Sequence, residues 1–286
     1  MLVQNPLTPQ HFSINCKGTL LSLSSPVVMG ILNITPDSFF DGGRFVSKDA
    51  ALFHAERLIK EGASILDIGG CSSRPGSNDI SEEEELHRVI GIIEAIHTEW
   101  KEAILSIDTF RSKVAYEAIM AGASIVNDIS AGDDDKDMIQ TVARLGVPYV
   151  AMHKQGKPAN MQQNPIYADV TTDVLDYFIK KIAILHEAGI VDIILDPGFG
   201  FGKNKVHNYE LFKNIEAFKI LDCPIMVGVS RKRMINEVLE ISSRDALNGT
   251  TVLNTIALTK GAKILRVHDV KEAVEAVKLV GELGIY

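Results

Sequence analysis

The chain has 286 residues, 46% of them apolar, and a formal net charge of −8. This length suits one α/β barrel with a large core. No apolar stretch reaches the roughly 20 residues that span a bilayer. No lysine/arginine block indicates a nucleic-acid partner. The N-terminus MLVQNPLTPQ lacks the basic-then-apolar order of a signal peptide. We therefore expect a cytoplasmic protein that binds neither membranes nor nucleic acid. Cys16, Cys71 and Cys223 are widely spaced, which predicts three reduced thiols.

In chain order, the first predicted element is a short hairpin at 12–24, FSINCKGTLLSLS, which we expect to close the N-terminal mouth of a barrel. Eight short β-branched runs then alternate with longer stretches of helical periodicity. Near-continuous apolar strands that alternate with helices indicate a parallel sheet, and eight units favour a closed (β/α)8 TIM barrel. We predict a single domain over 1–286, with the barrel proper at about 27–280. The runs occupy residues 27–34, 64–68, 103–108, 124–128, 148–153, 191–196, 224–229 and 263–268.

Between the predicted strands, residues 82–100 and 168–188 carry their apolar side chains on one helical face. The charge run at 81–85, one serine and four glutamates, has the pattern of a capping box, and we expect it to form a solvated first helical turn. The segment 240–260 predicts an extra helix before the last strand.

Polar residues follow almost every predicted strand at its C-terminal end, where the loops of such barrels form one rim. Taken singly, each is explained equally well as a helix cap or a turn residue. Asp108, Asn127 and Asp196, at three different strand ends, together place two acids and an amide on this rim. Such a set can bind a guanidine-like edge.

Cations follow the seventh and eighth predicted strands. The run 230–232, Ser-Arg-Lys, opens a helix, while Arg266 and His268 alternate on the last strand so that both can face the mouth. Barrels commonly bind phosphate at this position. The sequence therefore favours an anion site after the last two strands.

Three loops of the rim have unusual compositions. NITPDSFFDGGRF, residues 33–45, and GGCSSRPGS, residues 69–77, predict a pair of loops that closes over the site. IILDPGFGFGK, residues 193–203, combines glycines and a lysine, which suggest a phosphate cradle, with an acid and two aromatic rings, which suggest a flat heterocycle. We favour the heterocycle for this loop and expect Lys203 to be solvated.

The motifs NITPDSFFDGG, GGCSSRPGS, SIDTFRS, NDIS, LDPGFGFGK, VGVSRK and RVHDV, in this order, resemble those of the dihydropteroate synthase family. The resemblance implies a (β/α)8 barrel, a homodimer and a transferase of folate biosynthesis that sulfonamides target. Members join 4-aminobenzoate to 6-hydroxymethyl-7,8-dihydropterin diphosphate, forming 7,8-dihydropteroate and diphosphate with Mg²⁺ assisting. The chain departs from the family at Cys71, where a glutamate is usual, which puts the role of that position in doubt.

The resemblance also implies a role for each matching residue. The catalytic set would be Asp108, Lys232, Arg74 and Asp37. The pterin would meet Asp108, Asn127, Asp196 and Lys232, between walls formed by Met152 and Phe201. Ser73, Arg266 and His268 would bind phosphate, Asn33 the metal and diphosphate, and Asp37, Phe39, Arg74 and Pro75 would form the 4-aminobenzoate pocket. Gly228 and Ser230 complete the substrate-binding set.

These residue types fit a dissociative, SN1-like path, in which the dihydropterin delocalises the charge left by the departing diphosphate and Asp108 offsets it. A methyltetrahydrofolate:corrinoid methyltransferase would not need the cations after the last two strands. A non-catalytic pterin-binding paralogue is disfavoured by the intact Asp37, Arg74, Lys232 and Arg266. A nicotinamide oxidoreductase is disfavoured because GFGFGK has the wrong glycine spacing.

Overall fold

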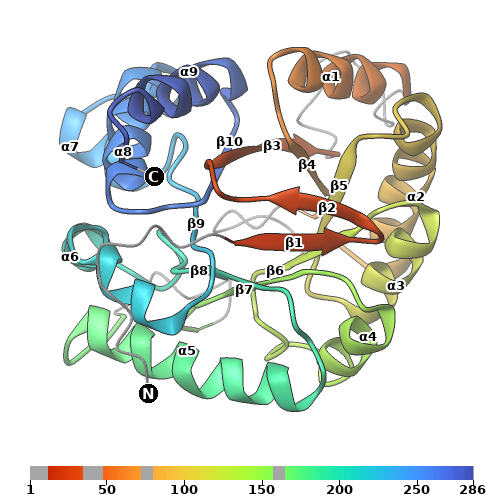
Figure 1. Ribbon diagram of the computed structural model, residues 1–286, viewed down its shortest axis with the longest axis horizontal. Helices are drawn as coiled ribbons and strands as arrows, with labels where there is room; N and C mark the ends of the chain where they lie inside the picture. The colour runs from red at the N-terminus through yellow and green to blue at the C-terminus, as the bar shows by residue number, and fades with distance from the viewer. Residues whose placement is uncertain (1–11, 35–47, 72–79, 157–164, 286) are drawn as a thin grey trace.

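The computed structural model describes residues 12–34, 48–71, 80–156 and 165–285. After a two-stranded hairpin, β1 Ser13–Cys16 and β2 Thr19–Ser22, strands and helices alternate along the chain (Figure 1). The remaining strands are β3 Val27–Asn33, β4 Ile65–Gly69, β5 Ile104–Asp108, β6 Ile125–Asp128, β7 Tyr149–Met152, β8 Ile193–Asp196, β9 Met226–Val227 and β10 Ile264–Val267. The helices are α1 Lys48–Lys60, α2 Glu82–Glu99, α3 Ser112–Ala121, α4 Met138–Leu145, α5 Val170–Glu187, α6 Lys205–Lys213, α7 Arg233–Leu239, α8 Leu247–Thr259 and α9 Val270–Gly281, with 3-10 helices η2 Ile215–Leu221 and η3 Ser243–Asp245.

The eight parallel strands form one sheet in the order β8-β7-β6-β5-β4-β3-β10-β9. A parallel bridge between Leu195 and Ile225 joins β8 to the segment that leads into β9, and so closes the sheet into a barrel. Each predicted strand run overlaps one of these strands, and β4 alone extends one residue beyond its run, so the predicted (β/α)8 barrel is confirmed. Because all strands run the same way, their C-terminal ends lie at one mouth of the barrel.

The hairpin lies at the opposite, N-terminal mouth. Successive side chains of a strand point to opposite faces of the sheet. One residue of each barrel strand that points into the barrel contributes to a single apolar layer. The hairpin side chains Ile14 and Cys16, together with Leu23, are at most 3% exposed and pack against this layer. The predicted plug is thus confirmed, and it shields the barrel interior from water on this side. The layer comprises Met29, Ile65, Ile104, Ile125, Val150, Ile194, Met226 and Ile264.

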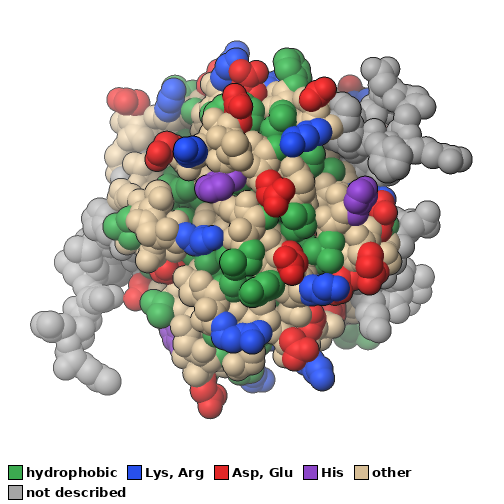
Figure 2. Space-filling view, turned by 90° about the vertical axis from the view of Figure 1, so that its right-hand side faces the viewer, with side chains coloured by type: hydrophobic (Ala, Val, Ile, Leu, Met, Phe, Trp, Pro, Cys, Tyr) green, Lys and Arg blue, Asp and Glu red, His purple; other side chains and the backbone are tan. Residues whose placement is uncertain are grey.

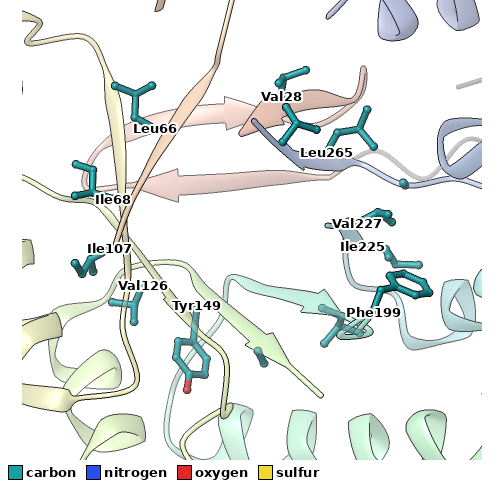
Figure 3. Close-up of a cluster of buried hydrophobic side chains, with 14 of the residues drawn as sticks. Val28, Leu66, Ile68, Ile107, Val126, Tyr149, Phe199, Ile225, Val227 and Leu265 are labelled. Atoms are coloured by element: carbon teal, nitrogen blue, oxygen red, sulfur yellow. The ribbon is translucent and has the colours of Figure 1, made fainter. Parts of the chain in front are cut away.

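Outward-facing strand residues form the larger core between the sheet and its helices. Figure 3 shows members of this cluster from all around the sheet, among them Val28, Leu66, Val126 and Leu265. Burying a side chain of this size contributes roughly 1.5–3 kcal/mol. The sheet is therefore rigid enough to hold functional groups at its ends.

Helices α2 and α8 lie where the sequence predicts them. The extra helix expected within 240–260 is α8. Ser81 caps α2 by accepting a hydrogen bond from the amide of Glu84. The expectation of a solvated first turn is wrong for Glu85, which is fully buried because it pairs with Arg111 at the start of α3.

The outer surface carries both signs of charge. Figure 2 shows acidic and basic side chains interspersed over the side of the molecule that lies to the right in Figure 1. Within the described residues, no helix combines the length and the hydrophobicity that a membrane span requires. Cys16, Cys71 and Cys223, all among the described residues, form no disulfide bond, as predicted.

Candidate active site

A polar layer lies directly above the apolar layer inside the barrel. It begins two residues further along the strands, with Asp67 on β4, Asn127 on β6 and Arg266 on β10. Arg266 donates from Nε to Asp67 Oδ2 over 2.6 Å and from Nη2 to Asp108 Oδ2 over 2.6 Å. Asn127 donates from Nδ2 to Asp67 Oδ2 over 3.0 Å. One guanidinium and one amide thus hold two carboxylates at the C-terminal mouth, which sets the positions of all four groups.

Asp67 was not predicted from the sequence as a site residue. It is fully buried, and its Oδ1 has no hydrogen-bond partner among the described residues. The signal in the sequence was an acid in the middle of the apolar run SILDI, where burying a carboxylate is costly unless it is paired. Its two partners come from β6 and β10, so reading strand ends alone could not find it.

Asp108 and Lys232 both have perturbed pKa values. Burial raises the pKa of Asp108 to about 7, although Arg266 opposes this shift, and the negative charge of Asp67 adds to it. Burial lowers the pKa of Lys232 to about 8, against the attraction of Asp196. Perturbed titratable groups gathered in one cleft are typical of functional sites.

Asp196, at the end of β8, begins the loop 196–204. Its side chain is 5% exposed, burial raises its pKa, and its Oδ1 accepts a hydrogen bond from the amide of Gly198 over 2.8 Å. Its other carboxylate oxygen, Oδ2, takes no part in that bond. The loop therefore fixes the orientation of this carboxylate before any ligand arrives.

Lys232 lies over the same loop. Its Nζ donates to the carbonyl of Phe199 over 2.6 Å and lies 4.8 Å from the centre of the Phe201 ring. A Cβ built on Gly228 would be 3.9 Å from Lys232 Nζ and 3.8 Å from Arg266 Cβ. The predicted Lys232, Phe201, Gly228 and Arg266 are thus brought together, and Gly228 leaves room between the two cations.

The expectation that Lys203 is solvated is wrong. Its side chain is 1% exposed, and its Nζ contacts His153 Nδ1 over 2.9 Å and the carbonyls of Gly198 and Phe201 over 3.0 and 3.2 Å. The loop folds back over its own lysine because backbone carbonyls and one imidazole replace water around the ammonium group. Met152, the other predicted wall residue, is 2% exposed at the end of β7.

The predicted anion site after β9 and β10 is only partly assembled from the residues expected. Ser230 Oγ accepts from the amide of His268 and lies 3.1 Å from His268 Nδ1. The hydroxyl can donate its hydrogen to Nδ1, which leaves the imidazole hydrogen on Nε2 as a donor. These two predicted residues therefore form one unit.

Arg231, between Ser230 and Lys232, does not contribute to such a site. It forms two hydrogen bonds to the Asp269 carboxylate and donates to the carbonyls of Ser243 and Arg244. Asp269 occupies the N-cap position of α9, but its side chain makes no capping hydrogen bond and pairs with Arg231 instead. This pair anchors the connection to η3.

Asn33, the predicted metal ligand, ends β3 beside Asp108. A Cβ built on Gly69 would lie 3.8 Å from Asn33 Oδ1 and 3.6 Å from Asp108 Oδ2, so the two oxygens flank this glycine. Within the ranges that the structure describes, no three His, Cys, Asp or Glu side chains form a ready metal site. The amide carbonyl oxygen of Asn33 is nevertheless a ligand type that suits Mg²⁺, which in proteins commonly shares its coordination with substrate phosphates.

Five of the predicted site residues lie outside the described residues. Asp37 and Phe39 belong to 35–47, and Ser73, Arg74 and Pro75 belong to 72–79. Their predicted roles stay predictions. Cys71 immediately precedes the second of these segments and is partly exposed.

Replacing Gly198 by alanine is expected to destabilise the fold by about 1–3 kcal/mol more than replacing Gly200 by alanine. Both glycines have positive φ, 70° and 82°, so both variants share the backbone strain. A Cβ at Gly198, however, would lie 1.9 Å from the carbonyl oxygen of His153, whereas at Gly200 the nearest atom is Lys232 Cδ at 3.5 Å. Denaturant unfolding measures the difference, and equal losses would show that the close approach to His153 is not limiting.

Comparisons with known proteins identify the family of the chain. The family model of pterin binding enzymes matches residues 29–268. A dihydropteroate synthase of Escherichia coli K12 is 46% identical over 266 residues, which cover 92% of this chain and 94% of that protein.

Two solved structures extend the comparison to the whole fold. A Yersinia pestis dihydropteroate synthase in a sulfonamide drug complex superposes with a TM-score of 0.91, at 42% identity over 96% of this chain and all of that one. A Xanthomonas albilineans dihydropteroate synthase in complex with 7,8-dihydropteroate has a TM-score of 0.87, at 36% identity over 96% and 99% of the two chains. With its barrel, its polar layer and these matches, the chain belongs to the family of pterin binding enzymes.

Proposed function

We propose that this chain condenses 6-hydroxymethyl-7,8-dihydropterin diphosphate with 4-aminobenzoate, giving 7,8-dihydropteroate and diphosphate in folate biosynthesis. The observation that carries the proposal is the arrangement of Asp108, Asn127 and Asp196 at one mouth of the barrel with Lys232 and Arg266. The acids and the amide suit the nitrogen-rich edge of a pterin, and the cations suit its carbonyl and its diphosphate.

The hydrogen bonds already present leave one acceptor on each of three residues. Asp108 uses Oδ2 for Arg266, Asn127 uses Nδ2 for Asp67, and Asp196 uses Oδ1 for Gly198. Asp108 Oδ1, Asn127 Oδ1 and Asp196 Oδ2 take part in none of these bonds. In our proposal these three oxygens accept from the amino group and ring N–H groups of the pterin, which is a row of neighbouring donors.

Lys232 supplies the complementary donor. An ammonium group has three N–H bonds, and the hydrogen bond to Phe199 uses one of them. We place the pterin carbonyl on another. Phe201, whose ring lies under the same ammonium group, forms one apolar wall and Met152 the other.

The charge of the rim explains why a metal ion suits this reaction. Three carboxylates, Asp67, Asp108 and Asp196, face two cations, Lys232 and Arg266, so the rim cannot neutralise a diphosphate with its own side chains. Asn33 would hold Mg²⁺ together with the diphosphate, and the bound ion would neutralise charge on the leaving group. Arg266 and the Ser230–His268 unit would contact the same phosphates.

These positions support a dissociative, SN1-like path. The diphosphate leaves first, and the dihydropterin delocalises the positive charge on its exocyclic methylene. Asp108, held in place by Arg266, stabilises that charge electrostatically, because a preorganised carboxylate in a buried site acts more strongly than one in water. The amine of 4-aminobenzoate then attacks the methylene, and once the C–N bond has formed its nitrogen gives up one proton to the released diphosphate or to water. Asp37, Phe39, Ser73, Arg74 and Pro75, from the predicted closing loops, would complete its pocket and contribute to phosphate binding.

Release of diphosphate from the pterin diphosphate tests the proposed reaction. We expect release in the presence of 4-aminobenzoate and Mg²⁺, with 7,8-dihydropteroate formed in equal amount. Binding of the pterin without release under any condition would instead favour the non-catalytic pterin-binding paralogue. Methyl transfer from methyltetrahydrofolate to a corrinoid would favour the other alternative.

We also propose that two copies of this chain form a homodimer through α7 and α8. These helices contact each other, and Val238, Leu239, Val252 and Ile256 leave 37–52% of their surfaces exposed on them. Val252→Glu is expected to shift the protein to monomers in sedimentation velocity experiments. Ile179→Glu is the matched control, because Ile179 is 51% exposed on α5, away from α7 and α8 (Figure 1). Dimers in both variants would reject this surface.

The similarity to the Yersinia pestis enzyme extends the proposal to inhibition. Because that enzyme was solved in a sulfonamide drug complex, we propose that sulfonamides bind this chain in competition with 4-aminobenzoate. The cytoplasmic location and the lack of a nucleic-acid or membrane partner stay predictions from the sequence.

A further inference from the structure

Lys203 is a buried cation without a carboxylate within hydrogen-bond distance among the described residues. Its Nζ has three close acceptors, which are His153 Nδ1 and the carbonyls of Gly198 and Phe201, and a longer contact of 3.4 Å to the carbonyl of His153. An ammonium group has three N–H bonds, whereas a neutral amine has two. Burial lowers the pKa of Lys203 to about 7, and the three close acceptors match the charged form that prevails below this pH.

His153 is neutral, as it must be to accept a hydrogen bond from Lys203 at Nδ1. Burial, helped by the nearby charge of Lys203, lowers the pKa of His153 to about 2, so the imidazole is neutral and can accept at Nδ1. The ring also packs edge-on against Tyr177, with 5.0 Å between the ring centres. His153 is thus a fixed acceptor that directly follows β7 and faces the loop.

The contacts of Lys203 tie together the two ends of the turn. Gly198 and Phe201 are the first and last residues of the turn 198–201, and both carbonyls accept from the same ammonium group. Asn208, inside α6, adds a second tie by accepting from the amide of Gly200 and donating to the carbonyl of Lys203. The backbone between residues 198 and 203 is therefore held from inside the protein.

The constrained backbone is the same one that positions Lys232. The carbonyl of Phe199 accepts from Lys232 Nζ, and the ring of Phe201 lies beneath it. The amide of Gly198 also holds Asp196 Oδ1. Lys203 makes no hydrogen bond to these three side chains, so it acts on them through the loop and, for Asp196 and Lys232, also through the longer-range field of its charge.

We propose that Lys203, with His153 as its acceptor, is a positioning residue that fixes the loop 196–204 and thereby orients Lys232 and Phe201 toward the pterin. The inference rests on the proposed function, because it needs a ligand that Lys232 contacts. It assigns to the lysine of LDPGFGFGK a role in ligand geometry rather than in phosphate binding. Lys203→Met, which keeps the side-chain length and removes the three donors, is the direct test.

The experiment is a double-mutant cycle on the affinity for 6-hydroxymethylpterin, measured by isothermal titration calorimetry below the unfolding temperature of every variant. Lys203→Met is expected to weaken binding about tenfold, and Lys232→Met to weaken it as well. If Lys203 acts through Lys232, the double variant loses less than the product of the two single losses. Lys205→Met is the control, because Lys205 is exposed two residues away, and it should bind like the unchanged chain.

Steady-state kinetics separate positioning from simple stability. A residue that only stabilises the fold would change the amount of active enzyme, and hence kcat, without changing KM. We expect Lys203→Met to raise KM for the pterin diphosphate. If this variant does not fold, His153→Leu, which removes one of the three acceptors, enters the same cycle.

Three results would overturn the inference: full affinity in Lys203→Met, losses that multiply in the double variant, or a change in kcat alone. Failure of the unchanged chain to bind the pterin would overturn the proposed function as well. Binding by the unchanged chain with no effect of Lys203→Met would reject only the positioning role.

Discussion

Replacing Arg266 by methionine is expected to lower the free energy of unfolding by about 3–5 kcal/mol at pH 8, because breaking a buried ion pair leaves uncompensated charge. Arg266 holds both Asp67, which is fully buried, and Asp108, whose side chain is 11% exposed. Methionine fills much of the volume but leaves both carboxylates without the guanidinium. The loss is measured by denaturant unfolding and should exceed that of any single exposed ion pair.

The loss should depend on pH in a definite direction. Burial already raises the pKa of Asp108 to about 7 with Arg266 present, and removing the positive charge raises this pKa further. A folded-state pKa above the unfolded value of about 3.9 means that the charged form destabilises the fold above the folded pKa. The penalty is relieved as the pH falls below 7, so Arg266→Met should lose less stability at pH 5 than at pH 8.

Arg233→Met is the matched control for this experiment. Arg233 pairs with Glu237 on the surface of α7, with 77% of its side chain exposed, and such pairs contribute roughly 0–1 kcal/mol. Its small effect should not change between pH 5 and pH 8. A loss in Arg266→Met that is equally small, or that grows toward low pH, would contradict the charge assignment in the barrel.

Replacing Asp196 by alanine is expected to reduce kcat/KM for the pterin diphosphate by about 10²–10³-fold. Hydrogen bonds to charged groups contribute roughly 1.5–3 kcal/mol each. In our proposal Asp196 accepts from the pterin at Oδ2, while its Oδ1 accepts from the amide of Gly198 in the loop. Alanine removes both bonds. Asp196→Asn should lose less, because the amide can still accept one hydrogen bond.

Asp192→Ala is the control, immediately before the start of the same strand. Asp192 precedes β8 at the N-terminal mouth, where its carboxylate accepts from the amide of Asn15 in the hairpin. This change should affect stability and leave kcat/KM unchanged. Free diphosphate binding should weaken in Arg266→Met and stay the same in Asp196→Ala. If both variants lose pterin and diphosphate binding equally, the division of the site into a pterin end and a phosphate end is wrong.

The sequence predicted the fold well because the barrel is specified by local patterns. Apolar runs with flanking helical periodicity located all eight strands, and the hairpin and the extra helix followed from the same reasoning. The strand-end rule placed Asp108, Asn127, Asp196 and Lys232 at one mouth, since parallel strands must end together. The polar residues at that mouth could therefore be grouped without knowing any contact.

The sequence did not show which side chains far apart in the chain pair with each other. Asp67 and Arg266 are separated by 199 positions, and nothing local to SILDI indicates which cation neutralises the acid. For the same reason the sequence assigned Arg231 to the anion site, although it pairs with Asp269, and left Asp67 out of the rim.

Strand and helix periodicity depends on neighbours along the chain, so it was enough to predict the barrel, the mouth that carries the site, and most of the residues around it. The pairing of charges, by contrast, could be found only in the folded chain. Burial makes an unpaired charge costly, so Asp67 pairs with Arg266 across the barrel and Lys203 is surrounded by acceptors from its own loop and from His153. That is why Lys203, which the sequence left in solvent, lies beneath the loop and is held by three backbone and side-chain acceptors.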